Sequence, residues 1–117
     1  MAMVAQELGK DPKEFSKQEY LEWLADTVGQ QVGRMHKNGW YHSYLLTHNI
    51  TLDGKITDLD SVGWLKNDTE NKYVTLDNVN MRNSLGYFFE KLGLRKDEIE
   101  RITEIAISAY HRENPKN

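Results

Sequence analysis

Apolar residues recur at helical spacing in three stretches of the chain, and the first is the longest. It follows Ser16, which forms a capping-box pattern with Glu19, and it ends at Asn38-Gly39, a pair typical of helix C-termini. Its apolar positions are Leu21, Leu24, Val28, Val32 and Met35. We therefore predict a long amphipathic helix whose apolar stripe faces the core.

Two further helices are predicted in the second half of the chain. The first is capped by Asp77 or Asn78 and stopped by Gly93, and the second runs from about 96 to 112 with Pro115 beyond its end. The apolar positions of the first are Val79, Leu85, Phe88, Phe89 and Leu92, and those of the second are Ile99, Ile102, Ile105, Ala106 and Ala109.

One short β-hairpin is predicted between the first and second helices. Residues 50–52 and 55–57 suit extended strands, and Asp53-Gly54 between them is the strongest turn signal in the chain. Residues 63–74 follow neither period, so we expect an irregular segment there, anchored by Trp64 and Tyr73. The expected fold class is mainly α with one small β-hairpin. Residues 1–15 form a polar lead that we expect to fray, and 16–117 form a single domain.

Composition narrows the class of protein. The chain has 117 residues, of which 38% are hydrophobic, with a net charge of −3 and no cysteine. Its mean hydropathy is −0.73. It has no long apolar run or signal peptide, and Lys and Arg are dispersed, so we expect a cytoplasmic protein with no membrane or nucleic-acid partner. The lack of cysteine excludes disulfides and thiolate metal sites.

The hairpin suggests a metal site. It would return Asp58 and Asp60 toward the level of Asn49, so that an amide oxygen and a carboxylate could share one ion. Hard oxygen ligands suit Mg²⁺, which neutralises charge on phosphates during transfer. Only one of the two aspartates need bind, and the spacing leaves both open, with a slight preference for Asp58.

The segment GWYHSYLLTHN, residues 39–49, resembles the catalytic loop of protein-kinase-like enzymes, most closely that of the selenoprotein O family of pseudokinase adenylyltransferases. Gly39, His42, Thr47 and Asn49 fall in register with that family. The resemblance implies the helical C-lobe of a kinase-like fold, in which Asn49 and an aspartate bind Mg²⁺ or Mn²⁺ with ATP. It also implies that His42 is a loop anchor, hydrogen-bonded to backbone near Asp58 or Asp60.

Two positions depart from the expected pattern. Tyr44 stands where ordinary kinases have the Asp that accepts the substrate's proton, and a phenol is a poor base at neutral pH. His48 stands where the selenoprotein O family has an Asp thought to serve as base. Imidazole can accept a proton near pH 7, so His48 is the candidate catalytic residue.

The sequence does not show the motifs that mark the N-lobe of a kinase-like fold. No G-x-G-x-x-G follows a strand and no V-A-I-K lysine occurs, and Gly29 is isolated. We therefore expect an incomplete or vestigial Mg-nucleotide site for phosphoryl or nucleotidyl transfer, inactive alone, which a further domain or protein partner would complete. Without an N-lobe, the apolar surface that would contact that lobe needs another cover, which would favour a homodimer. The alternative is a non-catalytic helical module that binds a protein.

The aromatic and histidine residues allow further interpretations. The aromatic residues would form either an exposed surface for a partner or a base, or ordinary core and loop packing; they are Trp23, Trp40, Tyr41, Tyr44 and Trp64. His36, His42 and His48 recur every six residues. Because that spacing turns successive side chains by about 240° on a helix, we do not expect them to converge on zinc.

Overall fold

The computed structural model describes residues 17–43, 45, 49–51, 54–57, 62–67 and 71–115. Within these residues the elements follow in the order α2 (Lys17–Lys37), β1 (Trp40–Tyr41), β2 (Gly63–Trp64), the 3₁₀ helix η4 (Leu65–Asn67), α3 (Lys72–Lys91) and α4 (Lys96–Glu113). Three long helices and a small antiparallel strand pair confirm the expected mainly α class. None of the described helices is long and apolar enough to cross a membrane.

The first predicted helix is α2. Its apolar stripe is buried as expected at Leu21, Leu24, Val28 and Val32. The helix stops where Gly39 adopts a φ of +90°, and the Gly39 N–H donates to the His36 carbonyl at 3.0 Å. The last inward position differs from the prediction, because Met35 is only half-buried and His36 is buried instead.

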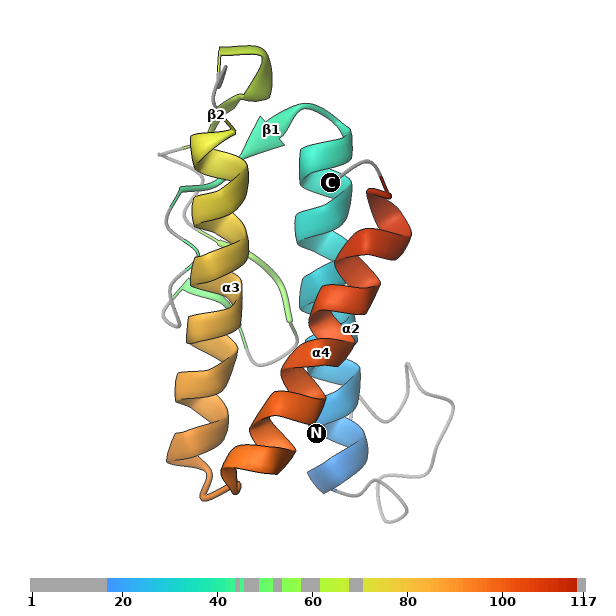
Figure 1. Ribbon diagram of the computed structural model, residues 1–117, viewed down its shortest axis with the longest axis vertical. Helices are drawn as coiled ribbons and strands as arrows, with labels where there is room; N and C mark the ends of the chain where they lie inside the picture. The colour runs from blue at the N-terminus through green and yellow to red at the C-terminus, as the bar shows by residue number, and fades with distance from the viewer. Residues whose placement is uncertain are drawn as a thin grey trace.

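Helix α4 crosses α2 at very close range (Figure 1). The approach depends on Gly29, where an added Cβ would lie 2.1 Å from the carbonyl oxygen of Ala106. At Gly33 an added Cβ would lie 2.6 Å from the carbonyl oxygen of Tyr110. The glycines therefore let two backbones meet, and Gly29, which stands alone in the sequence, has a packing role.

Helix α3 stands beside the α2–α4 pair and meets α4 through the turn at residues 92–95 (Figure 1). It begins at Lys72, so the prediction that Asp77 or Asn78 caps it was wrong, and residues 63–74 are not wholly irregular. Asp77 lies inside the helix and is fully buried. The predicted stop is confirmed, because Gly93 adopts a φ of +84°.

The core lies between the three helices and includes the loop residue Leu45. Two residues expected on the apolar stripe of α3 are exposed instead, Val79 at 48% and Leu92 at 38%. The buried apolar residues are Tyr20, Leu21, Leu24, Ala25, Val28, Val32, Leu45, Met81, Leu85, Phe89, Ile102, Ala106 and Tyr110.

The predicted hairpin is confirmed in its described residues. Ile50 and Ile56 form an antiparallel bridge, and the Thr51 N–H donates to the Lys55 carbonyl at 2.9 Å. Gly54 turns with a φ of +81° and packs against α2, where the Gln31 side-chain amide donates to the Gly54 carbonyl. The hairpin is therefore held against the long helix as well as paired with itself.

Strands β1 and β2 were not predicted. They are antiparallel and two residues long, with Trp40 opposite Trp64 and Tyr41 opposite Gly63. The chain therefore leaves α2 through β1 and returns through β2 to the same place. The loop and hairpin of residues 42–62 lie between these two strands in the sequence.

Candidate functional site

Asp77 of α3 holds the start of the loop that follows β1. Its Oδ2 accepts a hydrogen bond from the His42 N–H at 2.8 Å, and its Oδ1 accepts one from the Ser43 N–H at 2.7 Å. Two consecutive amides thus point at one carboxylate, and Ser43 itself adopts a φ of +72°, in the left-handed region. The buried aspartate thus fixes the loop in a conformation that L-residues rarely adopt.

The same carboxylate also forms a hydrogen bond with α2, and the α2 residue is in turn hydrogen-bonded to α4. The His36 Nε2–H donates to Asp77 Oδ2 at 2.8 Å, with both side chains fully buried. On the other side of the ring, the Tyr110 hydroxyl donates to His36 Nδ1 at 2.5 Å. The Asn114 side chain in turn donates to the Tyr110 oxygen at 3.4 Å. One buried chain of hydrogen bonds therefore joins all three helices to the loop.

This network is fully satisfied. In the described part of the chain every buried side-chain nitrogen or oxygen has a hydrogen-bond partner. A buried carboxylate is stable only where several donors replace its lost hydration, and Asp77 has three. The donors come from α2 and from the loop, so the aspartate specifies how these two segments sit on α3.

A second residue of α3, Ser84, also forms a hydrogen bond with the loop. Ser84 lies two helical turns after Asp77 and donates its hydroxyl to the Leu45 carbonyl at 2.6 Å. Leu45 itself is fully buried. Helix α3 thus contacts the loop at three positions, which lie within residues 39–49 and precede the candidate residues His48 and Asn49.

His42 joins the loop to the hairpin. Its Nε2–H donates to the Thr57 carbonyl at 2.8 Å, which confirms the expected bond from His42 to backbone near Asp58. The Thr57 N–H in turn donates to the Asn49 carbonyl at 2.8 Å. Thr57 is the residue immediately before Asp58, so the hairpin brings the chain back to Asn49 one residue before that aspartate.

The candidate ligands are only partly described. Asn49 is 4% exposed, beside the hairpin bridge. His48, Asp58 and Asp60 lie outside the described residues, so their predicted roles stay predictions. Among described residues, no group of three or more His, Asp or Glu side chains could hold a metal ion. Of the predicted donors, the amide of Asn49 is the described one, and amide oxygen suits Mg²⁺.

The histidine series does not share one set of partners. His36 bonds to Tyr110 and Asp77, whereas His42 bonds to Thr57. The ring nitrogens of His36 are both engaged inside the helical core. Each of these two histidines therefore has a hydrogen-bonding role in the fold, and His48 is outside the described residues.

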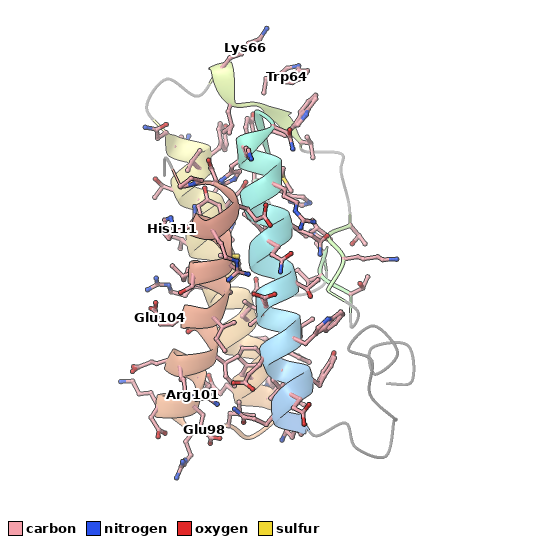
Figure 2. All side chains as sticks on the ribbon, turned by 90° about the vertical axis from the view of Figure 1, so that its right-hand side faces the viewer. Trp64, Lys66, Glu98, Arg101, Glu104 and His111 are labelled. Atoms are coloured by element: carbon pink, nitrogen blue, oxygen red, sulfur yellow. The ribbon has the colours of Figure 1, made fainter. Side chains whose placement is uncertain are left out.

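Aromatic side chains stack across the strand pair at one end of the molecule. The rings of Trp40 and Trp64 lie 3.4 Å apart between centroids, and those of Tyr41 and Tyr73 lie 4.1 Å apart. Trp64 remains 46% exposed, with Lys66 Nζ at 6.0 Å from its ring. Figure 2 shows Trp64 and Lys66 at the extreme end of the molecule. Stacking anchors Trp64 and Tyr73, as expected, and still leaves an exposed indole.

Sequence reasoning missed the residues that support the loop. Asp77 was read as a helix cap, because Asp before an apolar run is a common cap, and Tyr110 was not singled out. One signal was available: Asp77 lies on the side of α3 that also carries Met81, Ser84 and Leu85, all buried. An acidic residue at a core position of a helix indicates a buried partner.

Comparison of the chain with protein-family models, with curated proteins and with solved structures found no match.

Proposed function

We propose that the chain is a kinase-like C-lobe, or a portion of one, that carries an incomplete Mg-nucleotide site and does not catalyse transfer alone. In this proposal Asn49 and either Asp58 or Asp60 bind Mg²⁺ or Mn²⁺ together with ATP. His48 is the candidate base, and another domain or chain covers the phosphates. The reaction class is phosphoryl or nucleotidyl transfer, in which the metal neutralises charge on the phosphates.

The observation that carries the proposal is the joint between loop and hairpin. His42 bonds to the Thr57 carbonyl and Thr57 bonds to the Asn49 carbonyl, so backbone contacts tie the candidate amide ligand to the residue before the first candidate carboxylate. A metal site needs its ligands on backbone that is held in place by other contacts. Here the backbone is held at Asn49 and at Thr57. The support comes from the buried Asp77, which holds His42 and Ser43.

Isothermal titration with ATP tests the proposal. The wild-type chain should release heat with Mg²⁺ or Mn²⁺ present and none after EDTA is added. Asn49→Ala and one of the pair Asp58→Asn and Asp60→Asn should abolish the heat, whereas the exposed control Asn83→Ala should preserve it. Circular dichroism on each variant separates loss of the site from loss of the fold. Absence of heat at millimolar ATP, or heat that EDTA does not remove, would refute it.

A second candidate function is a helical module that binds a protein without catalysis. The exposed Trp64, held in place by its stack on Trp40, favours this alternative, because a rigid aromatic side chain loses little entropy on binding. Under this alternative, Asn49→Ala and the aspartate variants change only local stability. The same titration then shows no metal-dependent heat in any variant.

A further inference from the structure

The face of α3 that borders α4 carries exposed apolar and charged residues around a glycine. We define the α3 face by Val79, Arg82, Gly86, Tyr87 and Glu90. Val79 is 48% exposed and Tyr87 is 55% exposed, and Arg82 and Glu90 are also exposed. Four residues of the face, Arg82, Gly86, Tyr87 and Glu90, form part of the α3 side of a groove between α3 and α4. Figure 2 shows Glu104, which lines this groove, projecting from α4 on the side away from α2.

Gly86 has no function inside the chain that the structure explains. An added Cβ there would meet only Ile99 Cγ2, at an ordinary 3.8 Å, and Gly86 is not among the residues with positive φ. Gly29, in contrast, lies where α4 leaves no room for a Cβ. Glycine in a helix interior is less stable than alanine, so a glycine without an internal reason points to close approach from outside.

The charges on the α3 face are complementary to themselves. Arg82 and Glu90 lie four residues before and four residues after Gly86, on the same side of the helix. Neither forms an ion pair in the described part of the chain, whereas the acidic residues of α2 at Glu22 and Asp26 do. A two-fold axis through Gly86, with the two helices antiparallel, places Arg82 of each copy opposite Glu90 of the other.

We propose that the α3 face is a homodimer interface, in which a second copy of this chain docks with its own α3 antiparallel across Gly86. Gly86 lets the helices approach, Val79 and Tyr87 supply apolar contact, and two symmetric Arg82–Glu90 pairs set the direction. This inference is independent of the nucleotide site, since the face lies on α3 and the candidate ligands lie in the loop and hairpin.

Sedimentation equilibrium with charge-reversal variants tests the interface. Wild type should reach about twice the 13.7 kDa of one chain as its concentration rises. Arg82→Glu and Glu90→Arg should each weaken self-association by about tenfold or more, because each places like charges together twice. An equimolar mixture of the two variants should regain the dimer, since the acidic side chains of one variant then face the basic side chains of the other at both contacts. Lys37→Glu, the same charge change at the exposed end of α2, should dimerise as wild type does.

Gly86→Leu provides an independent arm that leaves the charges unchanged. The added side chain should prevent dimerisation while circular dichroism shows the helix content retained. A wild-type chain that stays monomeric from micromolar to millimolar concentration would overturn the proposal and assign the groove to another occupant. A dimer that forms equally well in both single charge variants would also overturn it, because the contact would then lie elsewhere on the surface.

Discussion

His36 Nε2 and Asp77 Oδ2 lie 2.8 Å apart with both side chains fully buried, although the two residues are 41 positions apart in the sequence. Because the same carboxylate also accepts from the amides of His42 and Ser43, a single acceptor sets both the packing of α2 on α3 and the backbone of the loop. Helix packing and loop conformation should therefore respond together when this acceptor is changed.

Removal of the Asp77 carboxylate should cost much of the stability of the domain. Asp77→Ala leaves three donors without an acceptor in the core, and we expect a loss of about 3–5 kcal/mol in the free energy of unfolding. Urea denaturation followed by circular dichroism measures it. The control Asp97→Ala removes an exposed carboxylate and should change stability by less than about 0.5 kcal/mol. Equal effects of the two variants would show that the buried network contributes little.

The hydroxyl of Tyr110 should contribute separately from its ring. Tyr110→Phe keeps the packing but removes the donor to His36 Nδ1, and we expect a loss of about 1–2 kcal/mol in unfolding free energy. Tyr87→Phe changes a tyrosine that is 55% exposed and should be neutral. Thermal unfolding of both variants provides the comparison. A Tyr110→Phe protein as stable as wild type would mean that water replaces the lost bond.

Ser43 should tolerate glycine better than alanine. Both Ser43→Gly and Ser43→Ala delete the hydroxyl, so the difference between them isolates the φ of +72°. The left-handed conformation costs L-residues about 1–2 kcal/mol, and we expect the glycine variant to be more stable than the alanine variant by about 1 kcal/mol. Chemical denaturation of the two variants measures this difference in the free energy of unfolding. If alanine proves the better residue, the loop does not need the left-handed backbone.

Two glycines inside helices should respond to alanine in opposite ways. Gly29→Ala drives a Cβ against the Ala106 carbonyl and should lower stability by about 2 kcal/mol or more. Gly86→Ala meets only ordinary contact and should raise the stability of the monomer by about 0.5–1 kcal/mol through helix propensity. Unfolding curves at low protein concentration separate the two. Stabilisation by Gly29→Ala would contradict the close crossing of α2 and α4.

The sequence was a good guide to elements with local signals. The stops at Gly39 and Gly93 were predictable because a glycine in the left-handed conformation ends a helix, and both have positive φ. The hairpin at 50–57 followed from Asp53-Gly54 between extended residues, and Ile50 pairs with Ile56. Such signals depend only on residues that are close together in the chain, so a single sequence is enough to find them.

Elements set by distant contacts were harder to predict. Asp77 resembled a cap because its partners on α2 and in the loop are 34 to 41 residues away. Strands β1 and β2 are two residues each, too short for a period to appear, and they bring together Trp40 and Trp64, whose rings stack. The start of α3 at Lys72 was missed because Asn71, in the left-handed region, makes no side-chain cap bond.

His42 should transmit the order of the loop to the hairpin. His42→Phe keeps a ring in a fully buried position but cannot donate to the Thr57 carbonyl. We expect the Thr57 and Thr51 amides, which hold the hairpin, to exchange their hydrogens about fivefold faster, since one hydrogen bond contributes about 1 kcal/mol. Native-state hydrogen exchange measures this residue by residue.

The amide of Ala106 in α4 is the internal control in the same sample, because that helix makes its own hydrogen bonds away from the hairpin. Faster exchange at Thr57 and Thr51 with Ala106 unchanged would place the effect of His42 in the hairpin. Uniform acceleration at all three would mean that His42 stabilises the whole domain and does not act selectively on the backbone around Asn49. In the first case the variant should also weaken the proposed metal-dependent ATP binding, because Asn49, the proposed amide ligand, would lose its support.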